Sequence, residues 1–376
     1  MTRRAAVVYD SLSPFSLGGG ERVYGRLAEL LVERGLQTDY VTRSVWEGAA
    51  PAAPYRVVGV WRGEIYDAHG VRTSGGALAF ALHVWLHFVR RRGRYEVVLA
   101  SALPVLTALA VRAALLGSRT RVIADWLEVW PAAKWREYSG SVAGTVAFVL
   151  QWIAAHLVRE HTADSRFTAE RLRKVRPDAH AVVLGLLDLV ELGRPAEAAT
   201  PPFVLFVGRL IADKGAVVVP AAVEIARKTL PDLRASIVGE GPERQNVIDE
   251  VARRNLGDVV DVLGRVSDEA LDGLRAGAAV LVAPSIREGF GLAVAEASAW
   301  GVPTVVVAHP DNAAVELVEE GLNGFVVAAG DSAALAAGIV EAVHAGPALR
   351  RSAAEWFVRA RVERGMSASL DQIVPQ

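Results

Sequence analysis

Residues 279–296 read Ala-Val-Leu-Val-Ala-Pro-Ser-Ile-Arg-Glu-Gly-Phe-Gly-Leu-Ala-Val-Ala-Glu, and this stretch decides the fold. Its first six residues form an apolar run that is typical of a buried parallel strand. A turn containing Gly289 and Gly291 follows, and a helix is expected directly after it. Turn glycines let a ligand approach the backbone, and a helix N-terminus offers unpaired N–H groups with a partial positive charge. The stretch therefore predicts an anion or nucleotide site.

Two glutamates bracket this turn. Glu288 lies directly before the turn, and Glu296 lies about two helical turns further along. Their carboxylates accept hydrogen bonds from hydroxyl groups and repel phosphates. A helix start that favours phosphate, placed between two carboxylates that favour hydroxyls, indicates a ligand that carries both a phosphate and a sugar.

The composition is that of a protein with sizeable cores. The chain has 376 residues, 52% of them hydrophobic and 22% charged, which indicates about two or three domains. It has no cysteine, so disulfides and thiolate metal sites are excluded and a reducing cytoplasm is permitted. The apolar run before Asp10 is too short for a signal peptide. We therefore expect a cytoplasmic protein, which can include a peripheral position at the inner face of the membrane.

The net charge of −1 conceals an asymmetry between the two halves. Residues 1–190 hold 24 Lys and Arg against 17 Asp and Glu, and the remainder holds 17 against 25. A basic first half suits an anionic acceptor or an anionic membrane surface, although the sharpest cluster, residues 90–94, is more simply a solvated loop. Nucleic acid binding is not favoured. The uncharged segment 141–158 is expected to be a buried helix rather than a membrane span.

Strand-helix alternation runs through both halves and predicts parallel sheets that are covered on both faces. A linker rich in Gly and Pro is expected between 189 and 202. The fold class is thus α/β, with an N-terminal domain at 1–190, a C-terminal domain at 191–353 and a last segment at 354–376. The strands expected are 5–9, 38–42, 97–100, 122–124, 203–207, 235–238, 259–263, 280–283 and 304–307.

Several loops that follow these strands have a composition suited to ligands. The loop 208–215 places Arg209, a fork-shaped donor, near Lys214, a compact cation, and both suit phosphate oxygens. Glycines 18–20 precede the first helix and allow close approach of an anion. The turn at Gly239 and the pair Arg265-Val266 suit a ligand or a plain structural turn equally. Each loop taken alone could also be a solvated or flexible turn.

Acidic residues and indoles follow the strand at 122–124. Trp stacks on the apolar faces of sugar rings, so Asp125 and Glu128 with Trp126 and Trp130 suit a sugar-binding surface, and core packing explains the same indoles equally well. The chain has no Asp-x-Asp and no His-Glu-x-x-His motif. We therefore expect no cofactor and no dedicated metal site.

Together these motifs resemble the retaining glycosyltransferases of family 4, which have the GT-B fold of two facing Rossmann-like domains with an interdomain cleft. The resemblance covers nearly the whole chain, is strongest over residues 203–327, and rests on the following segments: Gly18–Val23, Gly208–Gly215, Val238–Pro242, Pro284–Ala297, Gly301–Pro303 and Gly321–Gly324. Two departures stand out. The junction reads Gly185-Leu186-Leu187-Asp188, and Leu127 occupies the place where the family often has a histidine.

The resemblance implies a role for each matched position. Arg209 and Lys214 would hold the donor diphosphate, Glu296 the ribose, and Glu288 the donor sugar, while Asp125 is a candidate for the missing histidine's role. The catalytic candidates are thus Arg209, Lys214, Glu288 and Asp125. The residues expected to bind the nucleotide sugar are Gly19, Gly20, Gly208, Arg209, Lys214, Gly239, Arg265, Val266, Glu288, Gly289, Phe290, Gly291, Leu292 and Glu296.

The implied reaction is metal-independent transfer of a sugar, with retained configuration, from a nucleoside diphosphate to an acceptor hydroxyl. UDP is the favoured nucleotide of the donor, and GDP is the next. The acceptor is a glycan, a lipid-linked sugar or a small natural product. The alternatives are a GT-B nucleotide-sugar epimerase and a non-catalytic protein that binds sugar nucleotides. The last segment, 354–376, is expected to be a helix that crosses back to the N-terminal domain.

Overall fold

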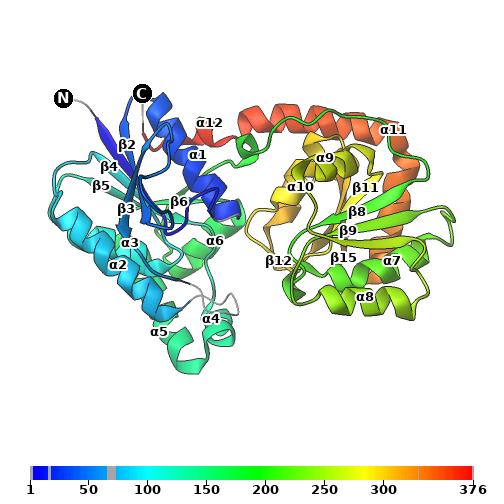
Figure 1. The fold of residues 1–376 in the computed structure, drawn as a ribbon, viewed down its shortest axis with the longest axis horizontal. Helices are drawn as coiled ribbons and strands as arrows, with labels where there is room; N and C mark the ends of the chain where they lie inside the picture. The colour runs from blue at the N-terminus through cyan, green and yellow to red at the C-terminus, as the bar shows by residue number, and fades with distance from the viewer. Residues whose placement is uncertain (1–2, 16–17, 66–72, 329, 375–376) are drawn as a thin grey trace. The chain divides into compact units, whose positions relative to one another are not determined.

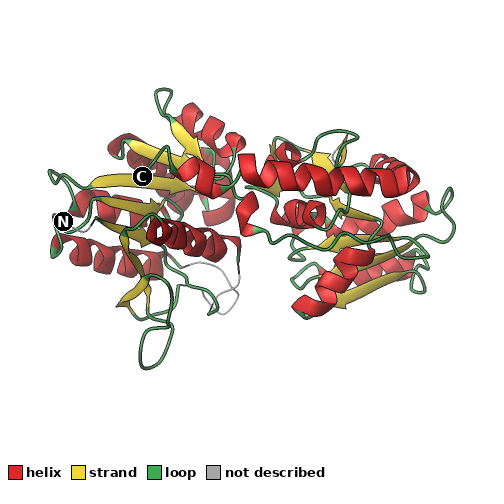
Figure 2. Ribbon diagram, turned by 90° about the horizontal axis from the view of Figure 1, so that it is seen from above, coloured by secondary structure: helices red, strands yellow, loops and turns green. Residues whose placement is uncertain are grey.

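The computed structural model describes residues 3–15, 18–65, 73–328 and 330–374. The chain divides into two compact units, Met1–Leu189 with Met366–Gln376 and Val190–Gly365. Each unit is a parallel sheet with helices on its faces (Figures 1 and 2). The α/β fold class predicted from the alternation of strands and helices is confirmed.

The first unit contains a parallel sheet of seven strands. In spatial order the strands are β3 (Arg56–Trp61), β2 (Gln37–Arg43), β1 (Arg4–Val8), β4 (Val97–Ser101), β5 (Arg121–Trp126), β6 (Glu160–Ala163) and β7 (Ala181–Val183). The central strand β1 is fully buried from Ala5 to Val8. A continuous apolar run is what a strand covered on both faces requires.

The helices of the first unit are α1 (Gly19–Glu33), α2 (Ser74–Val89), α3 (Val105–Ala114), α4 (Ala132–Ser139), α5 (Ser141–Leu157), α6 (Arg166–Val175) and α12 (Met366–Leu370). One apolar core joins α2, α3 and α5 to the same face of the sheet, through residues such as Phe80, Val111 and Ala154. Helix α1 lies on the opposite side of the sheet from α2 and α3 (Figure 1).

The second unit contains a six-stranded parallel sheet. Its order is β10 (Val260–Gly264), β9 (Arg234–Val238), β8 (Phe203–Val207), β11 (Val280–Ala283), β13 (Thr304–Ala308) and β15 (Gly324–Ala328), and a separate pair joins β12 (Arg287–Glu288) to β14 (Asp311–Asn312). The helices are α7 (Val219–Ala226), α8 (Arg244–Arg253), α9 (Asp268–Gly277), α10 (Leu292–Ala299) and α11 (Ser332–Glu363). Helices α7, α8 and α11 pack through one apolar core.

The end of the chain is shared between the units. Helix α11 contains a kink at Gly346-Pro347 and belongs to the second unit, which ends at Gly365, whereas residues 366–374 pack with the first. In the first unit Asp188 accepts a hydrogen bond from the Met366 amide at 2.8 Å, and Arg34 pairs with Asp371 at 2.7 Å. The segment expected at 354–376 is therefore divided at 365/366.

Every strand expected from the sequence is present, with ends shifted by two residues at most. The strands that were not expected are β3, β6, β7, β12, β14 and β15. Strand β6 has only four residues, and Glu160, His161 and Thr162 are polar. It therefore lacks the apolar run that predicts a buried strand.

The helix expected at 141–158 is present as α5, but the expectation that it is buried is wrong. Helix α5 buries Gly144, Gln151 and Ala154 on one side, but Val142 is 81% exposed on the other. Elsewhere in the described residues, one helical stretch, Ser332–Leu370, is long and apolar enough to cross a membrane. Core helices of soluble proteins meet the same criterion, and Trp356 of this stretch is buried in the second unit.

Candidate functional site

The strand order of the second unit identifies where a ligand can bind. The chain runs outward from β8 to β9 and β10, and then returns to place β11 on the other side of β8. In such doubly wound sheets ligands bind outside the carboxyl ends of the strands, at the point where the order reverses. The loops after β8 and β11, residues 208–215 and 284–291, meet at this point.

Lys214 and Glu288 form an ion pair across these two loops. Their side chains are 22% and 18% exposed, so the pair is mostly screened from water yet still accessible. A second ion pair, between Arg287 and Asp213 at 2.8 Å, joins the same loops. Lys214 and Glu288 come from motifs that are 74 residues apart, and both were expected to bind the same ligand. The fold brings the two side chains into contact.

Gly215 allows this close approach of the loops. Its φ of +65° lies in the left-handed region that side chains disfavour. A Cβ atom at this position would also collide with the carbonyl oxygen of Pro284. The glycine therefore sets the distance between Lys214, next to it in sequence, and the loop that carries Glu288.

Glu288 is held from both sides of its loop. Its Oε1 accepts a hydrogen bond from the Ser285 hydroxyl at 3.1 Å, and β12 pairs Glu288 with Asn312 of β14. Asn312 is buried, donates to the carbonyls of Ser285 (3.0 Å) and Val307 (2.8 Å), and caps the turn that follows it. Asn312 was not expected from the sequence, because an isolated Asn carries no motif.

Helix α10 begins at this loop with an open N-terminus. Gly291 precedes the helix with a φ of +99°, and a Cβ there would lie 2.6 Å from the Ala314 Cβ. No side chain caps the start of α10 within the described residues. Its first N–H groups, beside Gly289, Phe290 and Leu292, are thus free to bind an anion.

Glu296 lies further along α10 and forms an ion pair with Arg275 of α9. Arg275 also pairs with Asp272 at 3.1 Å, and the side chains of Arg275 and Glu296 are 14% and 17% exposed. No local pattern predicted Arg275, because its partner Glu296 follows 21 residues later on another helix. Arg275 fixes the carboxylate that was expected to bind a ribose.

The loops after β8, β9 and β10 adjoin at the same edge. The Gly208 amide donates to Val238, and the Gly239 amide donates to Gly264 at 2.9 Å. Arg209 and Arg265 are exposed beside these turns, and Val266 is half-buried. Neither arginine has an ion pair within the described chain. This edge of the sheet therefore carries two arginines that are available to bind a ligand.

In the first unit Asp125 lies inside a buried hydrogen-bond network. It is 1% exposed and accepts hydrogen bonds from Tyr24 at 2.7 Å and from Thr162 at 2.5 Å. Burial raises the pKa of the Asp125 carboxyl, while the two hydrogen bonds act in the opposite direction. This arrangement suits a structural role and leaves no open side to a substrate. Gly19 is exposed at the start of α1, with Gly20 beside it.

The tryptophans near Asp125 belong to the core. Trp126, Trp130 and Trp135 are all less than 10% exposed, and Gln151 accepts a hydrogen bond from the Trp135 indole at 3.0 Å. Of the two interpretations of these indoles, core packing is the one that the structure supports.

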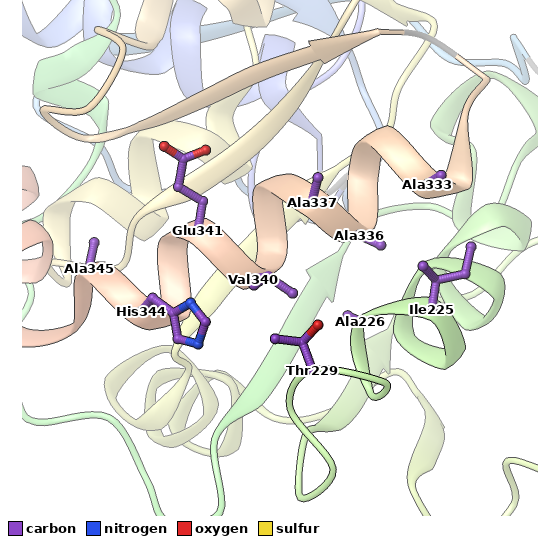
Figure 3. Close-up of a pocket in the computed structure, with 10 residues that line it drawn as sticks. All are labelled: Ile225, Ala226, Thr229, Ala333, Ala336, Ala337, Val340, Glu341, His344 and Ala345. Carbon is purple, nitrogen blue, oxygen red and sulfur yellow. The ribbon is translucent and has the colours of Figure 1, made fainter.

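A groove of about 690 Å³ lies elsewhere in the second unit, between α7 and α11 (Figure 3). Four alanines of α11 line it, with Glu341 and His344 toward one end. No Lys or Arg lines it to hold a diphosphate, so we place the site at the strand ends and not in this groove. The described residues contain no cluster of His, Asp and Glu suited to a metal ion.

Comparisons with known proteins show which proteins the chain resembles. Residues 191–355 match the family model described as "Glycosyl transferases group 1". One curated relative is the alpha-D-kanosaminyltransferase of Streptomyces kanamyceticus, which is 34% identical over 127 residues, or 34% of this chain and 32% of that protein. The chain matches between about a third and a half of the length of the first such relatives.

Solved structures match over the whole chain. Sucrose-phosphate synthase from Thermosynechococcus elongatus aligns with a TM-score of 0.75 at 19% identity, over 99% of this chain and 97% of that one. Anabaena HepE in complex with UDP and glucose aligns with a TM-score of 0.67 at 17% identity, over 99% and 98%. The expected GT-B fold is thereby confirmed. The chain thus has the GT-B fold, and its residues 191–355 match the family model of the group 1 glycosyl transferases.

Proposed function

We propose that the chain is a glycosyltransferase that moves a sugar from a nucleoside diphosphate to an acceptor hydroxyl, with retained configuration and no metal ion. The observation that carries the proposal is the Lys214–Glu288 ion pair at the strand-order reversal, beside the open start of α10. It supplies a cation for a diphosphate and a carboxylate for sugar hydroxyls in one place.

Three groups in this site have complementary roles. Lys214 and Arg209 hold the diphosphate, while Glu288 accepts hydrogen bonds from the sugar. Glu296, fixed by Arg275, accepts hydrogen bonds from the ribose. Arg265 and Val266, at the neighbouring strand end, border the nucleobase. We favour UDP over GDP as the nucleotide of the donor, and a fold relative solved with UDP and glucose supports that order.

In the reaction the bond between the anomeric carbon and the diphosphate oxygen breaks, and its electron pair leaves with the diphosphate. The acceptor oxygen bonds to the anomeric carbon on the same face, and its proton passes to the departing phosphate oxygen. Negative charge therefore grows on the diphosphate. Lys214, Arg209 and the N–H groups of α10 are positioned to stabilise that charge in advance, which is commonly the largest contribution to catalysis.

Donor binding is tested first by thermal shift. A ligand at 100 times its dissociation constant adds about 2.7 kcal/mol of stability, and about 2–4 °C accompanies each kcal/mol in a unit of this size. We expect UDP or a UDP-sugar to raise the melting temperature by roughly 5–10 °C. The absence of a shift with every uridine and guanosine diphosphate sugar contradicts the proposal.

Activity is tested next, with the donor that binds. We expect slow release of nucleoside diphosphate from the donor alone, which a suitable acceptor accelerates. Chromatography of the donor after incubation separates the alternatives, because an epimerase converts the sugar without releasing nucleotide and a binding protein leaves it unchanged.

A further inference from the structure

The outer surface of the first unit has an apolar face on helices α2 and α5. Leu78, Leu82 and Trp85 are exposed along α2, and Val142, Val146 and Val149 along α5. Both triplets have the spacing of one helical face, because residues four and three apart lie above one another. A surface helix of a soluble protein normally has charged residues on its outer side. Neither helix contains a single charged residue.

Helix α3 connects these two helices into one surface, which we call the α2–α5 face. It packs against both α2 and α5, and all three cover the same side of the sheet through one core. Figure 1 shows them grouped on that side of the first unit. The exposed apolar residues therefore belong to one continuous layer of helices.

Arginines border the α2–α5 face along one edge. Each of the three helices leads into the next parallel strand, β4, β5 or β6, so their C-terminal ends share an edge of the sheet. Two hydrogen bonds tie these ends together, one from Arg92 to the Leu116 carbonyl and one from Arg112 to the Leu157 carbonyl at 2.9 Å.

The charge along this edge is mainly positive, because its two carboxylates, Glu96 and Glu160, are paired with Arg3 and Arg121. Residues 73–94, 101–123 and 138–159 contain no Asp or Glu and hold the arginines 90, 91, 92, 94, 112, 119, 121 and 159. Arg90, Arg91 and Arg119 have no ion pair within the described residues. Arginines at helix C-termini also stabilise the helices, so the charge alone identifies no partner. The combination of this positive charge with an uncharged, apolar surface does identify a class of partner.

We propose that the α2–α5 face docks on an anionic lipid bilayer. Helices α2 and α5 have 16 and 17 residues, too short to span a bilayer, which takes about 20. They are suited to lie in the interface with their apolar side chains at the acyl boundary. The arginines at the edge then reach lipid phosphates, whose charge is opposite to theirs. A protein partner of mixed charge gains nothing from a border of arginines alone.

The test is co-sedimentation of the full chain with vesicles. We expect binding to vesicles of phosphatidylcholine mixed with phosphatidylglycerol, and much weaker binding to phosphatidylcholine alone. Each basic residue near an anionic surface contributes about fivefold in affinity. The triple variant Arg90→Gln, Arg91→Gln, Arg119→Gln should therefore bind roughly 100-fold more weakly. A control variant, Arg253→Gln, Arg351→Gln, Arg359→Gln, removes the same charge from the second unit and should bind like the parent chain.

Insertion is tested separately at Trp152, which is 47% exposed on α5. Brominated phosphatidylcholine in the anionic vesicles should quench part of the tryptophan fluorescence, and that part should vanish in Trp152→Phe. Equal binding to neutral and anionic vesicles, equal loss in both triple variants, or no quenching assigned to Trp152 overturns the proposal. So does a stable dimer in lipid-free solution that Val146→Ser separates, because the face is then an interface between two copies.

Discussion

Replacing Lys214 with alanine tests the candidate site most directly. The change removes the cation of the Lys214–Glu288 pair and leaves the Ser285 hydroxyl on Glu288, at 3.1 Å. If Lys214 stabilises the departing diphosphate, turnover should fall by about 10²–10³, the usual cost of one such donor. That loss corresponds to roughly 2.7–4 kcal/mol in the activation free energy.

The cost of the same change to folding is smaller. Exposed ion pairs contribute about 0.2–1 kcal/mol, whereas breaking a buried pair costs about 3–5 kcal/mol. The two side chains here are about one-fifth exposed, and Glu288 keeps one hydrogen bond, so we expect a loss of about 1–2 kcal/mol in the free energy of unfolding. The melting temperature should fall by roughly 2–8 °C, which leaves the protein folded in the assay.

The assay is nucleoside diphosphate release at saturating donor, with the melting temperature measured on the same sample. Lys228→Ala is the matched control, because Lys228 is exposed, lies in the second unit and follows the C-terminal end of α7, outside both site loops. It should keep full turnover. A Lys214→Ala enzyme that keeps turnover within about threefold of the parent refutes the role of Lys214 as a diphosphate ligand, since one donor is worth far more.

Three further changes probe the surroundings of the site. Gly215→Ala should lower the free energy of unfolding by about 1–3 kcal/mol in urea titration, because of its positive φ and the collision with Pro284; a neutral result contradicts the close approach of the loops. Arg275→Ala should weaken donor affinity about tenfold in calorimetry by releasing Glu296, and unchanged affinity excludes a ribose role for this carboxylate. Burial raises the pKa of Asp125, so the stability it contributes is present below its ordinary pKa and is lost as pH rises through the raised value. Asp125→Asn should therefore flatten the decline of unfolding free energy with rising pH above about 4, and a large loss of turnover at unchanged stability would instead restore a catalytic role.

The fold was largely readable from the sequence, because buried parallel strands leave continuous apolar runs such as 203–207 and 280–283. Strand β6 was missed because three of its four residues are polar. Its pairing with β5 forms only in the folded chain, and no local pattern reveals it. The helix at 141–158 shows the opposite failure. Its apolar composition indicates burial, yet only its neighbours determine which side is covered, and one side is not.

The candidate site was readable where glycine-rich turns mark the ends of strands. Lys214, Glu288 and Glu296 came from such motifs. Arg275 and Asn312 carry no local signal, because each acts on a residue that only the fold brings near. Sequence reasoning therefore located the groups expected to touch the donor but missed the residues that hold those groups in place.

The charges around the site have a consequence for how each cation acts. Lys214, Arg287 and Arg275 are already paired with Glu288, Asp213 and Glu296, so these pairs add no net charge. Arg209 and Arg265 stay uncompensated in the described chain, and their combined charge of +2 is suited to attract a diphosphate. Lys214 must exchange Glu288 for phosphate, and that exchange becomes more favourable as charge grows on the leaving group. An interaction that strengthens in the transition state raises kcat rather than affinity. Arg209 should therefore affect mainly KM, and Lys214 mainly kcat.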